Sequence, residues 1–378
     1  RSAPSRPRAP RISMAVSPKL SSRSPTSRPP GNDAARTPAK GAQVECLGAA
    51  CDLPLPPFRP SRFWRPADLQ TMRNYLRRPH HDLAPWRCQR IWLDVAGGDR
   101  LAAALHARER IGHAPLVVLI HGLTGCADSH YLRASAHAWL SAGFPVCRLN
   151  LRGSPPSRPA CKGHYHAGRS ADIADALTGL MAHCPEIARS GVVPVGYSLG
   201  GNMLIKFLAE TGRRFPVRAA ASISAPIDLA ATSRRFHAPR NWIYHRWLLR
   251  RLKIEATQPP AALSRRERAA IAQARSVYAF DDGFIAPHHG FADAMDYYVR
   301  CSGEQFLPGV AVPFLAIHAA DDPWIPVAAY RRTPWAQNPN IGAALTARGG
   351  HVGFHARDHA VPWHDRAVMA FARTVLSG

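Results

Sequence analysis

Short apolar runs alternate with stretches of helical periodicity from about residue 87 onward. Residues 116–122 (LVVLIHG) are apolar at nearly every position, as expected of a strand that is covered on both faces of its sheet. Residues 129–143 follow with helical spacing and end at a glycine, and residues 145–153 (PVCRLNLRG) form the next predicted strand. This alternation predicts βαβ crossovers and therefore a mainly parallel sheet.

The same cycle continues to about residue 225 and is then interrupted. Between about residues 228 and 300 the chain carries aromatic and cationic helical stretches such as RNWIYHRWLLRRL, and strand-like runs return at residues 312–326 and 343–354. We therefore predict the α/β fold class, with helices flanking a mainly parallel central sheet and a helical cap inserted at about 228–300. The cap is expected to lie over the carboxyl edge of the sheet.

The first 60 residues have a different composition. They are dense in Pro, Ser and Arg, as in SSRSPTSRPPG, and they show no apolar periodicity. Such a segment cannot bury enough apolar surface to offset the entropy that is lost on ordering. The sequence predicts a disordered basic tail at residues 1–60 and one folded domain at residues 61–378, which is long enough to bury a full core.

The chain is strongly basic, with 49 Lys and Arg residues against 25 Asp and Glu residues and a formal net charge of +24. A nucleic-acid-binding protein usually gathers its cations in a patch or carries a recognisable motif. Here the arginines are spread along the whole chain and no such motif occurs, so we expect no nucleic-acid partner. The charge is compatible with weak association with an anionic membrane surface, and it leaves the oligomeric state undetermined.

Cysteine usage and hydropathy indicate a soluble protein in a reducing compartment. The eight cysteines are scattered without CxxC pairs, and a chain of this length does not need disulfides to fold. No run of 18 apolar residues indicates a membrane span, and the chain does not open with the charged and apolar regions of a secretory signal. A cytoplasmic location is the resulting expectation.

Residues 194–205 (VPVGYSLGGNML) place a GxSxG motif between a predicted strand and a predicted helix. In that context, glycines at positions 196 and 200 allow a turn so tight that Ser198 is raised above the sheet and the next backbone N–H is left free. A serine in such a turn becomes a nucleophile when a neighbouring base accepts its proton. Ser198 is therefore the candidate nucleophile.

An acid and a histidine are expected after later strands, in the order Ser, Asp, His. His351 follows the last predicted strand, and the two glycines before it free the backbone at that point. Asp321 and Asp322 stand at the end of the preceding strand. The DxxxP spacing between Asp322 and Pro326 favours Asp322 as the orienting acid and leaves Asp321 to organise the loop.

The oxyanion that forms in acyl transfer needs two hydrogen-bond donors. One is expected from the backbone N–H of Leu199, directly after the serine. The other is expected from the loop after the strand LVVLI, where HGLTG (121–125) offers the backbone N–H of Leu123. The alternative interpretation of this HG pair is a simple turn that ends the strand.

These motifs resemble those of the YheT-type α/β-hydrolases, a bacterial group related to the eukaryotic ABHD hydrolases. The resemblance runs from about residue 62 to the C-terminus and rests on ADLQTMRNYLRR (67–78), IHGLTG, NLRG, YHAG, VGYSLGGNML, FDDGFIAPHHGFADAMDYYVRCS (280–302), HAADDPWIP and GGHVGF. It implies an α/β-hydrolase fold, ester hydrolysis, and Ser198, Asp322 and His351 as the triad. One departure is Asp68, which stands where that group has the first residue of an HLQT-like tetrapeptide.

Further segments of the resemblance have no independent mechanism. Arg152 in NLRG and the pair Tyr165-His166 in YHAG follow a strand edge, where they either line a pocket or, as we favour, organise loops through hydrogen bonds. The pair Asp281-Asp282 lacks the nearby third ligand that a metal site would need. We expect no metal and no cofactor.

The leading interpretation is a serine hydrolase that cleaves carboxylic esters, short-chain or lipid-like, through a Ser-Asp-His triad and an acyl-enzyme. The apolar and cationic cap favours a lipid-like ester as the small-molecule substrate. Two alternatives remain open. One is an acyltransferase that uses the same triad, and the other is a non-catalytic hydrolase-like protein that binds anions or lipids.

Overall fold

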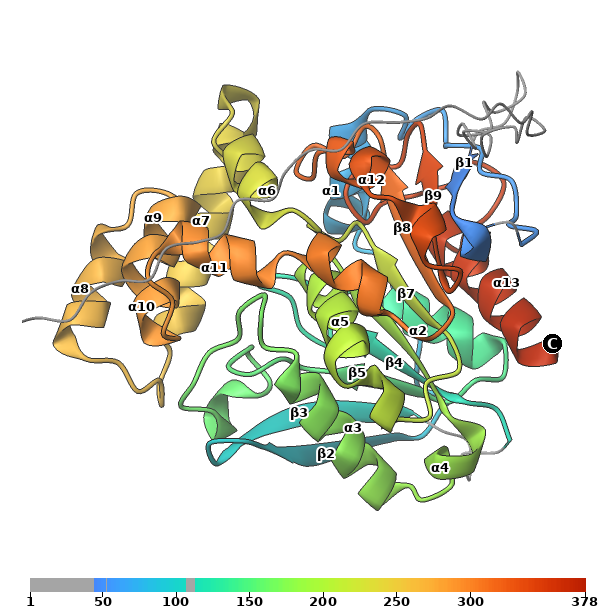
Figure 1. Cartoon of the computed structure of the whole chain (residues 1–378), viewed down its shortest axis with the longest axis horizontal. Coiled ribbons are helices and arrows are strands. Elements are labelled where there is room, and N and C mark those ends of the chain that lie inside the picture. Colours follow the sequence, from blue (N-terminus) through green and yellow to red (C-terminus); the bar gives the residue numbers. More distant parts are fainter. Residues whose placement is uncertain (1–43, 52, 107–112) are drawn as a thin grey trace, which may run out of the picture. The chain divides into compact units, whose positions relative to one another are not determined.

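The computed structural model describes residues 44–51, 53–106 and 113–378, which form one sheet with helices on both faces (Figure 1). Across the sheet the strand order is β1-β9-β8-β7-β6-β4-β5-β3-β2. The strands from β9 to β5 in this order are parallel, while β1, β3 and β2 add in antiparallel fashion at the two edges. The bounds are β1 (Val44–Leu47), β2 (Cys88–Val95), β3 (Asp99–His106), β4 (Leu116–Ile120), β5 (Val146–Leu149), β6 (Val192–Tyr197), β7 (Ala220–Ile223), β8 (Phe314–Ala319) and β9 (Ile341–Thr346). The predicted α/β class with a mainly parallel sheet is confirmed.

Helices cover the two faces of the sheet in two layers, with α3 and α5 on one face and α2 and α13 on the other (Figure 1). The helices outside the cap are α1 (Ala67–Arg77), α2 (His130–Ser141), α3 (Ala171–His183), α4 (Ile187–Ser190), α5 (Leu199–Glu210), α12 (Ala328–Arg332) and α13 (Trp363–Ser377). Short 3-10 turns are η1 (Ala49–Cys51), η2 (Arg158–Ala160), η3 (Gly212–Arg214), η4 (Pro239–Asn241), η6 (Gly303–Gly309) and η7 (Trp335–Gln337). No helix in the described ranges combines the length and the apolar content that crossing a bilayer requires.

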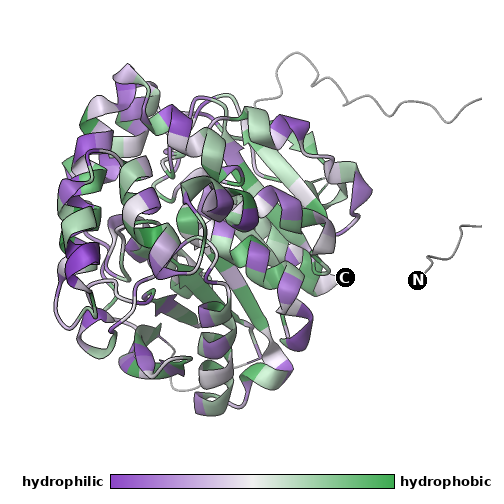
Figure 2. Cartoon of the chain, turned by 60° about the vertical axis from the view of Figure 1, so that its left-hand side comes forward, coloured by the Kyte–Doolittle hydropathy of each residue, from purple (hydrophilic) through white to green (hydrophobic). Residues whose placement is uncertain are grey.

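The central strand β4 shows why the sequence is continuously apolar there. Leu116, Val118 and Ile120 belong to the core that lies under α3 and α5, whereas Val117 and Leu119 belong to the core under α2 and α13. Successive side chains of a strand point to opposite faces, so a strand covered on both faces buries all of them. Figure 2 accordingly shows the strands of the sheet as mostly hydrophobic.

Between β7 and β8 the chain forms the cap, which we define as helices α6 to α11 (residues 229–301). Its elements are α6 (Leu229–Phe236), α7 (Trp242–Thr257), α8 (Arg265–Gln273), α9 (Val277–Phe280), the π-helical turn η5 (Asp281–Ile285), α10 (Ala286–His288) and α11 (Ala294–Cys301). Helices α7 to α11 lie to the left of the sheet in Figure 1. The cap follows the carboxyl end of β7 directly, and its residues share a cavity with residues that follow β4 and β6. The predicted insertion at about 228–300 falls on this segment.

The predicted boundary at residue 60 is wrong for the part of the tail that the structure describes. Strand β1 pairs antiparallel with β9, from Val44 opposite Thr346 to Leu47 opposite Ala343. A four-residue strand has too few positions to show a periodic pattern, and it is held by backbone hydrogen bonds to an existing sheet edge. Residues 1–43 of the predicted tail lie outside the described residues.

Phe58 anchors the second half of this segment. Its side chain is 1% exposed, and its ring centroid lies 5.3 Å from that of Trp363 and 6.2 Å from that of Phe354. The indole Nε1–H of Trp363 donates to the carbonyl oxygen of Pro56 at 2.7 Å. The segment that precedes α1 is therefore part of the folded domain.

We expect Phe58→Ala to lower the free energy of unfolding by about 3–5 kcal/mol, the usual cost of truncating a buried aromatic side chain. Phe63→Ala is the matched control, and it should change that free energy by less than about 0.5 kcal/mol because Phe63 is 88% exposed. Urea denaturation of the two variants measures the difference. Equal losses would contradict the packing of Phe58 described above.

Candidate active site

Ser198 occupies the turn between β6 and α5, with φ of 50° and ψ of −123°. This left-handed conformation is uncommon for a residue with a side chain, and it is kept here because the neighbouring turn is closely packed. A Cβ at Gly200 would lie 2.4 Å from the carbonyl oxygen of His121, and one at Gly196 would lie 2.5 Å from the carbonyl oxygen of Gly200. Glycine is required at both flanking positions, and the Ser198 side chain lines the cavity.

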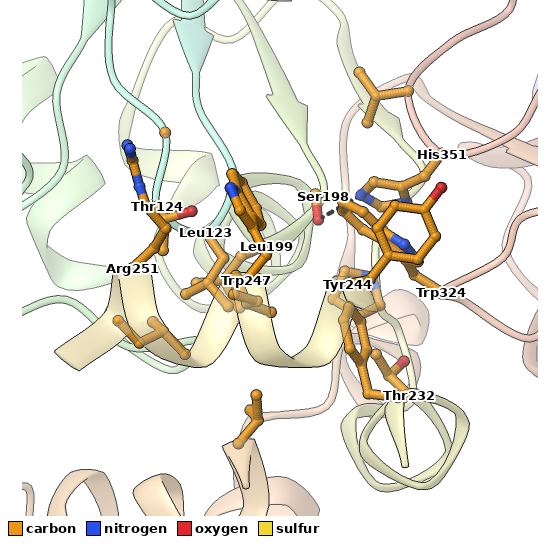
Figure 3. Close-up of a pocket in the computed structure, with 18 of the residues that line it drawn as sticks. Leu123, Thr124, Ser198, Leu199, Thr232, Tyr244, Trp247, Arg251, Trp324 and His351 are labelled. Atoms are coloured by element: carbon orange, nitrogen blue, oxygen red, sulfur yellow. Dashed lines mark hydrogen bonds between the residues drawn. The ribbon is translucent and has the colours of Figure 1, made fainter. Parts of the chain in front are cut away.

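His351 lies between Ser198 and Asp322 and contacts both. Its Nε2 is 3.0 Å from Ser198 Oγ, and its Nδ1 is 2.8 Å from Asp322 Oδ2 (Figure 3). A carboxylate is an acceptor, so Nδ1 carries the imidazole proton and Nε2 is left to accept the proton of the serine hydroxyl. The structure thus brings together the three residues that the sequence selects, from the loops after β6, β8 and β9.

The carboxylate of Asp322 is buried and fully engaged. Its Oδ1 accepts the backbone N–H groups of Trp324 at 2.8 Å and Ile325 at 3.0 Å, while Oδ2 faces His351. Burial on its own would raise the pKa of Asp322, but the contact with His351, together with His318 and the Ile325 N–H, holds that pKa below its usual value. The group is ionised at neutral pH, as an orienting acid has to be.

Asp321 points to a different partner. Its Oδ1 accepts the backbone N–H of Gly350 at 2.9 Å, and no contact joins its carboxyl group to the imidazole of His351 in the described residues. Burial raises the pKa of Asp321. Of the two adjacent aspartates, Asp322 contacts the imidazole and Asp321 ties down the loop that carries it, as two successive residues that leave a strand point in different directions.

The imidazole of His318 lies beside this pair, and neither of its ring nitrogens has a hydrogen-bond partner among the described residues. Its ring stacks on that of Tyr330 at 4.2 Å, and its Nδ1 is 4.0 Å from Asp322 Oδ2. Burial lowers the pKa of His318 to about 4, so it is neutral at pH 7. The positive charge next to Asp322 can therefore arise on His351 when that residue accepts a proton.

Helix α1 supplies a support for the histidine that sequence reasoning missed. Thr71 Oγ1 accepts the backbone N–H of His351 at 2.9 Å and donates to the carbonyl oxygen of Ala67 at 2.8 Å. The buried side chain of Gln70 accepts the N–H of His355 at 2.7 Å and donates to its carbonyl oxygen at 3.1 Å. The LQT part of the ADLQT segment thus anchors the loop that carries His351. The family resemblance of the ADLQT segment was the one signal in the sequence that pointed to it. The neighbouring residues gave no indication that this segment contacts the loop of His351.

The loop after β4 has its amides arranged around Leu123. The N–H of Gly122 donates to Tyr131 Oη at 2.9 Å, and the N–H of Thr124 donates to Tyr165 Oη at 2.7 Å. The N–H of Leu123, between them, has no acceptor among the described residues. Two tyrosines therefore fix the loop on either side of one free donor.

The second free donor is Leu199 N–H, at the first position of α5. The first N–H groups of a helix have no acceptor within the helix, and none is present here among the described residues. A Cβ built on Gly122 would lie 2.8 Å from Ser198 Cβ, so the loop that carries Leu123 passes directly against the serine. Both predicted oxyanion donors thus belong to backbone segments that adjoin Ser198.

His121 in the HG pair organises the same loop. Its Nε2 accepts the N–H of Leu151 at 3.0 Å, so its Nδ1 carries the proton and donates to the carbonyl oxygen of Gly122 at 2.7 Å. Burial lowers the pKa of His121 to about 4. The residue is a neutral hydrogen-bonding link between this loop and the segment after β5, and it does not line the cavity.

Arg152 organises loops, as we favoured from the sequence. Its guanidinium is buried and binds both carboxylate oxygens of Asp172 at 2.9 and 2.7 Å, and it also binds Asp99 at 2.6 Å. Tyr165 combines the two roles considered for it, since its ring lines the cavity and its hydroxyl accepts the N–H of Thr124. His166 also lines the cavity.

The cavity beside Ser198 has a volume of about 600 Å³, within the range of ligand sites in proteins. The cap closes it from one side, and in Figure 3 helix α7 runs beneath Ser198 with Tyr244, Trp247 and Arg251 facing the site. Its wall is largely apolar and includes Leu229, Phe236, Leu248, Leu252, Phe280 and Ile285. Trp324, also missed from the sequence, covers the imidazole of His351 at a ring distance of 4.3 Å.

The aspartates of the FDDGFIAP segment have separate partners. Asp281 lines the cavity and accepts from Tyr298 Oη at 2.6 Å, whereas Asp282 accepts the N–H of Ala294 at 3.0 Å. Burial raises the pKa of Asp281 to about 7, although the hydrogen bond from Tyr298 favours its ionised form. No group of three or more His, Cys, Asp or Glu side chains suited to a metal ion occurs in the parts of the chain that the structure describes.

Comparisons with known proteins agree with this architecture. Residues 115–355 match the family model described as alpha/beta hydrolase fold. The protein named "Putative esterase YheT" of Escherichia coli is 35% identical over 301 residues, which cover 79% of this chain and 86% of that protein. Phospholipase ABHD3 of Mus musculus is 27% identical over 242 residues, which cover 64% of this chain and 58% of that protein, so this chain spans less than two thirds of its length. Among solved structures, the Pyrococcus furiosus esterase Pf2001 superposes with a TM-score of 0.52 at 16% identity, covering 78% of this chain and 92% of that one.

Replacing Asp322 by Asn should lower kcat by about 10⁴-fold, because the amide cannot hold the imidazole in the right tautomer or stabilise the imidazolium. Asp321→Asn is the matched control and should cost less than about tenfold, since an amide oxygen can still accept the N–H of Gly350. Turnover of one ester by both folded variants is the measurement. If Asp321→Asn is the inactive variant, the geometry has been misassigned.

Thr71→Val should lower kcat about tenfold with little change in KM, because it keeps the shape of the side chain but removes the acceptor for the N–H of His351. Thr71→Ser keeps the hydroxyl and should restore kcat. Steady-state kinetics of the two variants, with their Tm values as a check on folding, test this. A loss in both variants, or a change confined to KM, would show that Thr71 does not position the histidine.

Proposed function

Because the chain belongs to the α/β-hydrolase family, and within it to the YheT group, we propose that it hydrolyses carboxylic esters with Ser198 as nucleophile, His351 as general base and Asp322 as orienting acid. The observation that carries this proposal is the hydrogen-bonded series Asp322–His351–Ser198 on the wall of a mainly apolar cavity. Membership of the family makes the chain a hydrolase. The roles of individual residues and the class of ester are our proposal.

In the first half of the reaction, His351 Nε2 takes the proton of Ser198 Oγ as that oxygen attacks the ester carbonyl carbon. The carbonyl oxygen becomes an anion, which the backbone N–H groups of Leu123 and Leu199 receive. These donors are fixed before the substrate arrives, so they cost no reorganisation when the charge develops. The imidazolium then gives its proton to the departing alcohol, and the acyl group stays on Ser198.

In the second half, a water molecule takes the place of the alcohol. His351 removes a proton from that water as it attacks the acyl carbon, and the same two N–H groups hold the second oxyanion. The imidazolium then returns its proton to Ser198 Oγ, and the carboxylic acid leaves. Asp322 keeps its charge throughout and stabilises the imidazolium in both halves.

The shape and lining of the cavity favour an ester with an apolar acyl chain. About 600 Å³ is more than an acetyl group fills, and the wall is largely apolar, with leucine, isoleucine and phenylalanine side chains among those that line it. Relatives are named as a phospholipase and an esterase, which agrees with lipid or small-molecule esters as substrates. We therefore propose medium-chain or longer acyl esters as the preferred substrate class.

A fluorophosphonate probe should label the wild-type chain and fail to label Ser198→Ala, because the probe reacts with an activated serine hydroxyl. On p-nitrophenyl esters of increasing acyl length, kcat/KM should rise from acetate to about octanoate, since each buried CH₂ adds about 0.8 kcal/mol of binding. Equal labelling of the two proteins would exclude Ser198 as the nucleophile. A maximum at acetate would contradict the proposed substrate class alone.

Two results would direct attention to the other functions considered. If added alcohol diverts the acyl group into a new ester faster than water hydrolyses it, the chain is an acyltransferase. If neither labelling nor turnover occurs with a folded protein, the chain is a non-catalytic binding protein. The free donors of Leu123 and Leu199 and the engaged triad argue for turnover, because a site used for binding alone has no need of them.

A further inference from the structure

Helix α7 of the cap exposes apolar and cationic side chains on one continuous face. At about 100° per residue, the exposed positions fall within one half of the helix, and the buried ones within the other half. The exposed half contains Trp242, Ile243, Arg246, Trp247, Arg250, Arg251 and Ile254. Ile243 is 72% exposed and Trp242 60%, which is unusual for residues of their size in a helix that already buries another face.

Helix α1 continues this surface across the mouth of the cavity. Its Tyr75 and Leu76 are exposed, and Tyr75 lines the same cavity as Ile243 and Trp247. Side chains that are both exposed and lining a cavity lie at its opening. The two helices are joined by Asp68, whose carboxylate binds Arg240 at 2.9 Å and accepts from Tyr244 Oη at 3.0 Å.

Among the described residues, the charged side chains of this surface that have no ionic partner are all cations. The exposed half of α7 carries three arginines and no acidic residue, and the acid of that helix, Glu255, is buried on the other half. On α1, Arg77 is exposed, while the acid of that helix, Asp68, is paired with a cation. Two of the arginines of α7 lie over exposed rings, Arg246 over Trp242 at 5.0 Å and Arg251 over Trp247 at 5.8 Å. Trp and aliphatic side chains between arginines are the composition of a helix that lies in a membrane interface.

We propose that the exposed face of α7, together with Tyr75 and Leu76 of α1, docks on a bilayer that contains anionic lipids. We call this set of residues the docking face. Arginines would contact lipid phosphates, and Trp242, Ile243 and Leu76 would enter the boundary between headgroups and acyl chains. Since Tyr75, Ile243 and Trp247 of the docking face lie at the cavity mouth, a lipid ester could pass from the bilayer to Ser198 without crossing water. This use of the docking face rests on the proposed function, whereas the docking itself does not.

Other occupants fit the docking face less well. A second copy of the chain would bring arginines against arginines, which is unfavourable in a symmetric interface. Single-stranded nucleic acid would use the arginines and the tryptophan rings, but it has no use for exposed Ile243, Ile254 and Leu76. A bilayer uses the aromatic, aliphatic and cationic side chains together.

Co-sedimentation of the full chain with vesicles of phosphatidylcholine, with or without phosphatidylglycerol, tests the proposal. Wild type should bind the anionic vesicles, more weakly at high salt, because salt screens the arginine contacts. Trp242→Ser combined with Leu76→Ser should weaken binding about tenfold or more, since it removes two of the three inserted side chains. Arg246→Gln combined with Arg250→Gln should weaken it by a comparable factor.

Each pair has a matched control elsewhere on the molecule. Trp92 on β2 is 40% exposed and lies under Arg100 at 5.5 Å, so Trp92→Ser removes a similar side chain outside the docking face. Arg213→Gln with Arg214→Gln removes two exposed cations of η3, at the far end of α5 from Ser198. Both controls should bind vesicles as wild type does. All these variants should hydrolyse a water-soluble p-nitrophenyl ester at the wild-type rate, because none of the changed residues lines the cavity.

Three results would overturn the proposal. One is that wild type binds neither kind of vesicle, and a second is that the controls lose binding as much as the docking-face variants. The third is that the docking-face variants still bind vesicles but no longer form a dimer, or no longer bind an RNA oligonucleotide, that the wild type forms or binds. If the full chain binds vesicles through the docking face but hydrolyses no ester, the proposed function fails and the docking face stands.

Discussion

The placement of the His351 imidazole is the constraint on which the rest of the site depends. The ring has to meet Ser198, 153 residues earlier in the chain, at hydrogen-bonding distance while its other nitrogen faces Asp322. No single element could hold it there, since the residue lies on a loop. The loop is tied to helix α1 through Thr71 and to the end of β8 through Asp321. The positions of α1 and of β8 in the fold are therefore part of the chemistry.

Burial decides which of the surrounding groups carry charge. His318 lies beside Asp322, and His121 lies at the start of the loop that carries Leu123; burial lowers the pKa of each to about 4, so neither competes with His351 for a proton at neutral pH. Asp322 is the exception, because its contacts outweigh the cost of burying its charge. Because the groups around the buried carboxylate of Asp322 are neutral, its negative charge acts mainly on the imidazole of His351. It therefore stabilises the imidazolium that forms when His351 accepts a proton.

Local patterns in the sequence were sufficient to predict the sheet, the serine turn and the choice of Asp322 over Asp321. Each of these depends on residues a few positions apart: an apolar run, a GxSxG turn, a spacing to Pro326. The supports of the histidine loop could not be predicted in this way, because Gln70 and Thr71 contact residues 280 to 285 positions away. The same holds for β1, whose four residues owe their conformation to the edge of β9. The ADLQT motif indicated that this segment matters, but it did not indicate that the segment contacts the loop of His351 and His355.

These long-range contacts explain what Asp68 does in this chain, where it replaces the first residue of the HLQT-like tetrapeptide. Helix α1 holds the His351 loop through Gln70 and Thr71, and through Asp68 it holds Arg240 and Tyr244 near the start of α7 in the cap. Tyr244 in turn packs edge-on against Trp324, which covers the imidazole. A displacement of the cap would therefore be transmitted to the histidine by two routes, one through α1 and one through Trp324. Since the ion pair of Asp68 is half-exposed, it is weak enough to break while Gln70, which is buried, keeps its contacts. The route through Asp68 is therefore the weaker of the two, and the packing of Tyr244 on Trp324 links the position of the cap to that of the imidazole.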